Sequence, residues 1–326
     1  CGFEDQRGNF NYITPEKIID ELKLVNEGKR IRLDHLLEPG RNGVIGNWTM
    51  KTIRANPPAV PPPPPALFSI LTYELAIQPP TTPVGNANQH NAIGQQGAQI
   101  DAWNHMGHGN GRNYNCFDLL DNNNLFVEPD ISNPPNTMFA GYKGFGIDKI
   151  DSIITRGVLI DVAKFKKAQM AAAGQDVSNF PPPGLVYTPE DFEDALESQG
   201  LKVADIEPGD VVMVRFGNAA KFWTEDPENV KNDRTATTGY FAAGQATWNA
   251  RGSQWIVNRK AAAIAGDTRG GEHRQLMSSG VTLIENLDTE LLAKDAHQRY
   301  NVNSDGKQAY IFLFIAQPLR CRGCSG

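Results

Sequence analysis

The amino-acid sequence predicts an α/β protein whose mixed β-sheet is flanked by helices. Three observations lead to this fold class. Apolar residues make up 40% of the 326 positions, which is enough for a substantial core. Segments with strand-like and helix-like hydrophobic patterns are mixed along the whole chain. They follow no regular βαβ repeat, so we expect a mixed rather than a purely parallel sheet. The length alone permits one large domain or two smaller ones.

The predicted helices are marked by their capping residues. Thr14 can cap a helix, Pro15 fits its first turn and Glu16 suits the helix dipole. We expect this helix to carry one apolar stripe and to end at a glycine, and the residues concerned are Ile18, Ile19, Leu22, Val25 and Gly28. Residues 163–173 form a second predicted helix, and a third begins at the well-capped segment 188–191.

The predicted strands alternate apolar and polar residues or form short apolar runs between turn residues. They are 30–37, 67–77, 156–162, 211–216, 281–287 and 310–316, with 255–265 as a strand–helix unit. Segment 156–162 lacks alternation, so we expect it to be buried on both faces. Residues 57–65 are nearly all proline and predict an exposed polyproline II loop between strands, although they could also bind a proline-recognition domain. The polar segment 223–253 is expected to cover the site or an interface.

Composition limits the partners and the compartment. The net charge of -6 argues against nucleic-acid binding, and no apolar run is long enough to span a membrane. Because Cys1 cannot be a natural initiator, the chain is expected to be trimmed. An even number of cysteines and a glycosylation sequon at Asn47 favour an extracellular, disulfide-bonded glycoprotein, the cysteines being Cys1, Cys116, Cys321 and Cys324. The alternative for the last two cysteines is a redox or zinc half-site.

One polar stretch, residues 95–109, stands out as a candidate site. In an extended segment Gln95, Gln99 and Asp101 share one parity, so their side chains can point to one face. His105 and His108 follow Asp101 at the spacing of one helix face. A strand that runs into a helix would therefore direct all five groups into one pocket, as a metal ion or a hydrolytic water requires. The alternative is a polar surface loop.

Several dispersed stretches together resemble one family. They are Gly8–Lys17, Gln99–Ala102 with His105, Arg156–Asp161, Pro208–Val212, Leu283–Leu287 and Pro318–Arg320. Their order is similar to that of the cyclase family, which includes bacterial kynurenine formamidase and isatin hydrolase. The resemblance implies a single cyclase-like domain over residues 1–326 with a swivelling β/β/α-like fold, the polyproline loop 57–65 lying within it. It also implies a metal-dependent hydrolase that opens small amides, lactams or lactones, assembled as a homodimer or homotetramer.

The resemblance implies a ligand set, from which this chain departs. The family motif H-x-x-x-H-x-D-x-x-x-H falls on Gln95, Gln99, Asp101 and His105, and the family's distal His and Glu fall on His273 and Glu285. Two imidazole ligands are thus replaced by amides, as in some fungal members of the wider family. Since an amide oxygen is a harder and weaker ligand than imidazole, this set favours manganese, magnesium or calcium over zinc, or no metal at all.

The residues of this set have expected roles and structural alternatives. Asp101 would anchor the metal, and His105, whose unperturbed pKa lies near neutral pH, would transfer protons. His108 would be a second site histidine or a solvated one. Gln95 and Gln99 could instead be core amides, and His273 could lie on a surface helix. Glu285 ends an apolar strand, where a charge is costly to bury without a partner. Two hypotheses follow: a hydrolase of small substrates, or a non-catalytic relative that keeps the fold for binding.

Overall fold

The structure is a computed structural model of the chain. It describes residues 4–35, 47–55, 68–76, 98–106, 112–119, 121–129, 138–222, 244–268, 270–302, 306–318 and 320. Several predictions concern residues outside these ranges, namely the polyproline segment 57–65, Gln95, His108 and three of the cysteines. Cys116 lies within them and is disulfide-bonded, although its partner does not lie within them.

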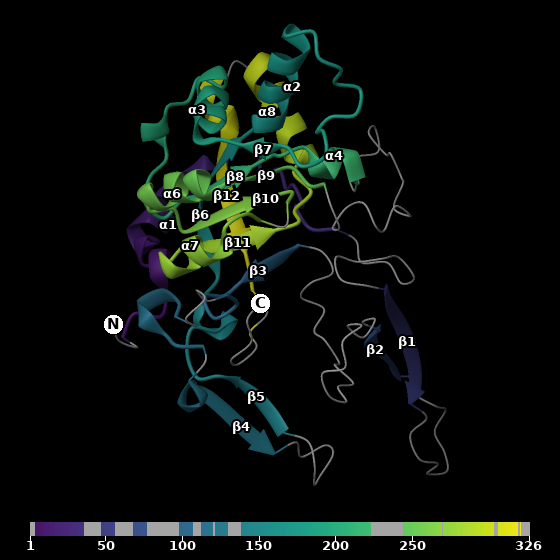
Figure 1. Cartoon of the computed structure of the whole chain (residues 1–326), viewed down its shortest axis with the longest axis vertical. Helices are drawn as coiled ribbons and strands as arrows, with labels where there is room; N and C mark the ends of the chain where they lie inside the picture. Colours follow the sequence, from purple (N-terminus) through teal and green to yellow (C-terminus); the bar gives the residue numbers. More distant parts are fainter. Residues whose placement is uncertain are drawn as a thin grey trace.

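A six-stranded mixed sheet forms the centre of the protein (Figure 1). Its spatial order is β12 (Ile311–Ala316), β6 (Ile153–Ile160), β8 (Val211–Val214), β10 (Ala263–Gly266), β11 (Thr282–Glu285) and β3 (Gln99–Asp101). Neighbouring strands from β6 to β11 run parallel. The two outer strands, β12 and β3, are antiparallel to their neighbours. The mixed sheet predicted from the sequence is therefore confirmed.

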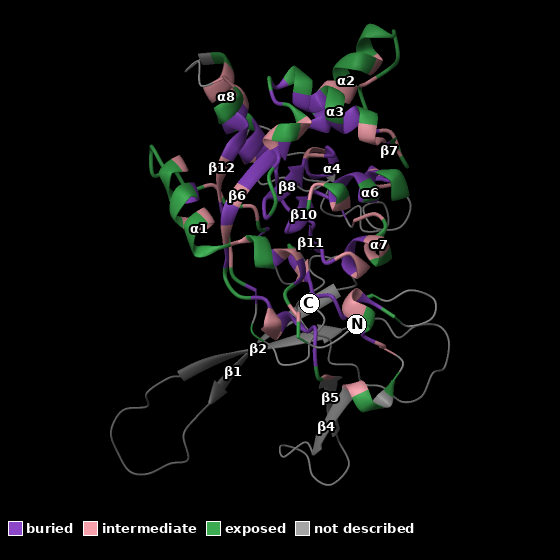
Figure 2. Ribbon diagram, turned by 90° about the vertical axis from the view of Figure 1, so that its left-hand side faces the viewer, coloured by how far each residue is buried: buried purple, intermediate pink, exposed green. Residues whose placement is uncertain are grey.

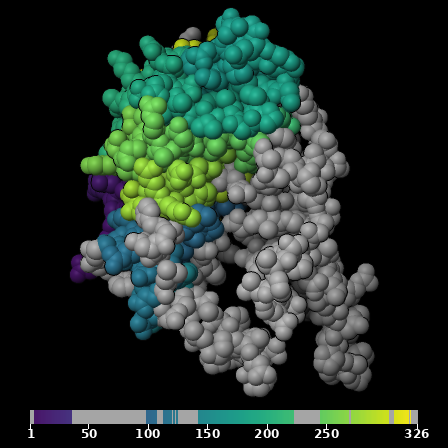
Figure 3. Space-filling model, viewed as in Figure 1, coloured from purple at the N-terminus to yellow at the C-terminus, as the bar shows by residue number. Residues whose placement is uncertain are grey.

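Helices flank the sheet on both sides. They are α1 (Pro15–Glu21), α2 (Val162–Ala172), α3 (Pro189–Ser198), α4 (Asn218–Phe222), α6 (Ala250–Asn258), α7 (His273–Ser278) and α8 (Glu290–Val302). In Figure 2, α1 and α8 lie to the left of the sheet, and α6 and α7 lie to the right. Thr188 caps α3 by a reciprocal pair of hydrogen bonds with Asp191, as its sequence predicts. In the space-filling view the teal to green residues form one continuous body (Figure 3).

Short elements surround this body. Small two-stranded sheets pair β1 (Asn47–Ala55) with β2 (Phe68–Ala76), β4 (Leu125–Pro129) with β5 (Met138–Tyr142), and β7 (Val186–Tyr187) with β9 (Thr247–Trp248). The 3₁₀ turns are η1 (Gly8–Tyr12), η2 (Leu22–Leu24), η4 (Tyr114–Cys116), η5 (Asn122–Asn124), η6 (Ile147–Lys149), η7 (Val203–Asp205) and η8 (Gly306–Tyr310). Within the described ranges, none of the helices has the length and hydropathy of a membrane span.

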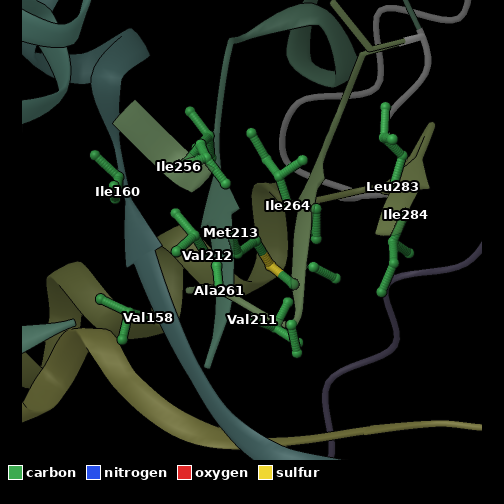
Figure 4. Packing of buried hydrophobic residues seen from close by; sticks show 14 of the residues in the cluster. Val158, Ile160, Val211, Val212, Met213, Ile256, Ala261, Ile264, Leu283 and Ile284 are labelled. Atoms are coloured by element: carbon green, nitrogen blue, oxygen red, sulfur yellow. The ribbon is translucent and has the colours of Figure 1, made fainter. Parts of the chain in front are cut away.

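The parallel strands supply the core. Val158, Val212, Ile264 and Leu283 come from four successive strands, are at most 2% exposed and pack in one layer (Figure 4). Burying a side chain of this size contributes roughly 1.5–3 kcal/mol. The apolar end of β6 is buried on both faces, as predicted. The strands thereby form a well-packed support for the polar residues at the ends of β11 and β3.

The first helix is shorter than predicted, because α1 ends at Glu21 rather than at Gly28, and most of its expected apolar stripe faces solvent. Ile19, Leu22 and Val25 are 61%, 51% and 51% exposed. The opposite, charged side of α1 faces the protein, because Lys17 Nζ lies 3.1 Å from Glu21 and 2.9 Å from the fully buried Asp210. Charge pairing, rather than apolar burial, therefore fixes how α1 docks.

Three other local predictions are also wrong. Residues 30–35 form no strand. The carbonyl oxygen of Leu33 accepts a hydrogen bond from Asp288 N, which lies in a loop and not in a neighbouring strand. The unit 255–265 has the reverse order, because α6 precedes β10. No helix follows Asp101, since residues 102–106 form a turn closed by the bond from His105 N to Ala102 O. Of the polar segment 223–253, residues 223–243 lie outside the described residues.

Candidate functional site

The candidate site begins with the pairing of β3 and β11. The antiparallel register places Gln99 opposite Glu285 and Asp101 opposite Leu283. Gln99 and Asp101 share one parity, and their side chains meet on one face, as the sequence predicts. The Gln99 amide nitrogen donates hydrogen bonds to Glu285 Oε2 at 2.9 Å and to Asp101 Oδ1 at 3.2 Å. Two carboxylates from different strands are therefore held around one amide.

His273 completes this group from the start of α7. Its Nε2 lies 2.8 Å from Glu285 Oε1 and 3.6 Å from Asp101 Oδ2. Its other ring nitrogen, Nδ1, lies 3.0 Å from the carbonyl oxygen of Gly271. A carbonyl only accepts hydrogen bonds, so Nδ1 carries a proton and orients the ring with Nε2 toward the carboxylates. His273 therefore lies against this group of buried carboxylates rather than on a solvated helix face.

His105 lies at the edge of the same group. The turn at residues 102–106 brings its Nε2 to 3.9 Å from Asp101 Oδ2, and its ring centroid lies 6.1 Å from that of His273. A turn therefore achieves the proximity that the sequence pattern attributed to a helix. His105 remains partly accessible, whereas Asp101 is fully buried.

Burial and mutual charge shift the pKa values of these groups. Burial, reinforced by the charge of Glu285, raises the pKa of Asp101 well above its usual value. For His273, burial opposes the charged form, but the hydrogen bond to Glu285 and its charge prevail and raise the pKa to about 9. For His105, burial and the nearby His273 lower the pKa to about 4. The pKa of His105 therefore lies below the unperturbed value near neutral pH.

The donor atoms fit a divalent cation. Asp101, His273 and Glu285 each offer a ligand atom, and these atoms lie within 4.8 Å of one another. At this distance two carboxylate charges repel by roughly 3 kcal/mol at an effective dielectric constant of 20. Asp101 Oδ2 and Gln99 Oε1 are buried and have no hydrogen-bond partner within the described ranges. Two carboxylates and one imidazole suit a divalent ion, and the oxygen of the adjacent Gln99 amide, if turned toward the site, would favour an oxygen-preferring one such as Mn²⁺ or Mg²⁺.

A second acidic group in the structure has a different character. Glu21, Glu207 and Asp210 also lie within metal-binding distance of one another. Arg156 and Lys17, however, already pair with Asp210 at 2.7 Å and 2.9 Å. Because two cations compensate this cluster, we assign it a structural role in docking α1 against β6.

Gly270 supports the site and was not singled out in the sequence. Its φ of +82° favours glycine, and a Cβ atom there would lie 2.1 Å from Glu285 Oε1 and 2.9 Å from His273 Cε1. Thr247 Oγ1 holds the Gly270 carbonyl at 3.1 Å. The sequence signal was the Gly270-Gly271 pair just before a histidine, since adjacent glycines often mark a close approach of the backbone to a site.

The structure brings together Gln99, Asp101, His105, His273 and Glu285. Two tryptophans near these segments pack against other aromatic rings. Trp103 is fully buried between Phe10 and Tyr114. Trp255 packs edge-on against Phe192.

Comparisons with known proteins identify the family. The model of the Cyclase family matches residues 48–273. A crystal structure of a novel cyclase is 25% identical and covers 99% of this chain and 94% of its own, with a TM-score of 0.68. Isatin hydrolase A from Labrenzia aggregata, bound to benzyl benzoate, is 13% identical with a TM-score of 0.49, covering 94% of each chain. An isatin hydrolase bound to the product analogue thioisatinate is 12% identical with a TM-score of 0.47, covering 90% of this chain and 87% of its own.

No curated protein matches the chain. The family match spans more than half of the chain, so this protein belongs to the cyclase family, as its sequence suggested. The matched residues include Gln99, Asp101, His105 and His273.

Proposed function

We propose that this protein is a divalent-metal-dependent hydrolase that opens amide, lactam or lactone bonds in small molecules. The observation that carries this proposal is the convergence of Asp101 and Glu285, both buried, with His273 within 4.8 Å. His273 already pairs with Glu285, but burying Asp101 beside that carboxylate is costly unless a further cation or a function retains it. Membership of the cyclase family, which led us to expect this chemistry, is consistent with it.

The residues that would hold the ion are Asp101, Glu285 and His273, with Gln99 Oε1 as a further oxygen donor. When bound, such an ion lowers the pKa of water and polarises the carbonyl group to be attacked. Asp101 and Glu285 would supply the negative charge that fixes the cation. Gly271 O, by accepting from His273 Nδ1, keeps the opposite ring nitrogen directed into the site.

His105 would move the proton. With a pKa lowered to about 4 it is neutral at pH 7, so its Nε2 can accept the proton released as water adds to the substrate carbonyl. The same proton then passes to the departing nitrogen or oxygen as the carbon–nitrogen or carbon–oxygen bond breaks. Its partly exposed position suits contact with substrate, whereas Asp101 lies deeper. A base of such low pKa is weak, so we assign most of the water activation to the cation.

The test is hydrolysis of a panel containing an N-formyl aromatic amine, a lactam and a lactone. Each substrate is assayed with chelator-treated protein, then after addition of Mn²⁺, Mg²⁺ or Zn²⁺. We expect turnover of at least one substrate class that requires an added ion and is absent in His105→Phe. Stoichiometric ion binding without turnover of any class would instead favour the non-catalytic binding role.

A further inference from the structure

Gln99 makes an unusual pair of contacts. Its side chain is 6% exposed, and both protons of its amide nitrogen are used on carboxylates, one on Asp101 and one on Glu285. The NH₂ group, and not Oε1, faces them, since Nε2 is the atom within hydrogen-bond distance of both carboxylates and the carboxylate of Glu285, paired with His273, can only accept. The amide oxygen is left buried without a hydrogen-bond partner in the described part of the chain. The amide thus occupies the position between two carboxylates where a cation would be expected.

We propose that Gln99 is a placeholder for the cation. In the metal-free protein its NH₂ group holds the carboxylates of Asp101 and Glu285 together. Rotation of the amide by half a turn presents Oε1 as a ligand when a cation enters, and this oxygen then gains the partner that it lacks. The proposal rests on the proposed metal site and adds a role for the amide that replaces imidazole there.

The residue type matters for this role. A histidine has at most one N–H on each ring nitrogen, and the two nitrogens lie on different sides of the ring. It could not bridge two carboxylates from one nitrogen as the amide does. Conversely, an amide oxygen is a weaker ligand than imidazole for zinc. With Gln99 in place of histidine, we expect the site to bind zinc less tightly, to stay ordered without metal and to bind an oxygen-preferring ion reversibly.

Two substitutions separate the two roles of the amide. Gln99→Glu keeps an oxygen ligand and adds charge but removes the bridging donors. We expect it to lower the unfolding midpoint of chelator-treated protein, and to bind Mn²⁺ on the order of tenfold more tightly because ligand charge is increased. Gln99→Met keeps the size but removes both functions. It should lower the metal-free midpoint and weaken Mn²⁺ binding by about tenfold or more.

A matched control is available in Gln199. This glutamine is 3% exposed and bonds to backbone groups of Asp161 and Leu159, outside the site. Gln199→Met should lower the unfolding midpoint and leave Mn²⁺ affinity unchanged. The readouts are thermal unfolding followed by circular dichroism with chelator present, and calorimetric titration with Mn²⁺.

Gln99→Glu is the decisive variant, because its metal-free stability and its Mn²⁺ affinity are expected to change in opposite directions. Lower metal-free stability together with tighter Mn²⁺ binding supports the placeholder role, whereas Mn²⁺ binding that is unchanged or weaker in this variant overturns it. If the variant unfolds without metal, refolding on addition of Mn²⁺ gives the supporting result and failure to refold gives the contrary one. Metal-dependent turnover in Gln99→Met with unchanged Mn²⁺ affinity would overturn this inference and leave the proposed function intact. If the Gln99 variants show the expected changes in midpoint and Mn²⁺ affinity but the protein turns over no substrate, the placeholder role is supported and the proposed hydrolase function is not.

Discussion

His273 Nε2 lies 2.8 Å from Glu285 Oε1, so the first residue of α7 is tied to the last residue of β11. The contact crosses from a helix on one side of the sheet to the strand beside β3. It places an imidazole against a buried carboxylate and within 3.6 Å of a second one. A single contact therefore links the packing of α7 to the electrostatics of the candidate metal site.

The stability of the metal-free protein should depend on pH through His273. Its pKa is raised from 6.5 to about 9, because the hydrogen bond to Glu285 outweighs the effect of burial. The stabilisation is therefore complete below pH 6.5 and is lost as the pH rises through 9. The measurement is the unfolding midpoint against pH with chelator present. His273→Gln should flatten this alkaline decline, and an undiminished decline in that variant would contradict the assignment.

Mn²⁺ affinity should rise over the same pH range. A cation needs the unprotonated Nε2 of His273, so binding releases a proton when the imidazole is charged. We expect calorimetric titrations in buffers of different ionisation enthalpy to show proton release at neutral pH, decreasing toward pH 9. Affinity that is independent of pH across this range would exclude His273 as a ligand.

Gly270→Ala should damage the site more than the fold. A Cβ atom would overlap Glu285 Oε1, and the φ of +82° adds roughly 1–2 kcal/mol of backbone strain. Gly184→Ala is the matched control, since its φ is +71° but no atom lies within 4 Å of the added carbon. Both variants should lose similar stability in chemical denaturation. Only Gly270→Ala should lose Mn²⁺ binding, and equal losses of binding would contradict the close approach.

Arg215 should contribute strongly to the free energy of unfolding. It donates to Asp161 at 2.9 Å and to Glu290 at 2.7 Å, and both carboxylates are buried. Arg215→Leu would remove the guanidinium from between two buried carboxylates, of which Asp161 keeps His297 at 2.9 Å, and breaking such a buried pair costs about 3–5 kcal/mol. Arg251→Leu, which removes an exposed ion pair with Glu190, should cause no measurable change in denaturant unfolding. Similar midpoints for the two variants would show that the buried network is dispensable.

Local patterns predicted much of the sheet and part of the site. Short apolar runs located β6, β8, β11 and β12, because buried strands carry that signal within the strand itself. The alternation of side chains along a strand also predicted that Gln99 and Asp101 lie on one face, because it too depends only on the strand itself. His273 and Glu285 entered the site only through the family resemblance. Their contact with each other depends on how α7 packs against β11, and their approach to Gln99 and Asp101 depends on the register between β3 and β11. No local pattern specifies either arrangement.

The wrong predictions have a common physical cause. The apolar stripe of α1 and the alternation in residues 30–35 are helix-like and strand-like by themselves. In the folded protein the ion pairs of Lys17 with Glu21 and Asp210 orient the helix instead. The turn after Asp101 likewise depends on tertiary contacts, such as the bond from Asn104 N to Phe145 O. Tertiary interactions decided these segments against their local preference.

Asp101 is proposed to anchor a divalent cation, and Mn²⁺ titration of wild-type and Asp101→Asn proteins tests this role most directly. Asparagine keeps the size of the side chain, so the circular dichroism spectrum should be unchanged. We expect the wild-type chain to bind a single Mn²⁺ ion. The variant should lose more than about 100-fold in affinity, since even outer partners of a metal site contribute 10–100-fold. Equal stoichiometry and affinity in the two proteins would contradict the account.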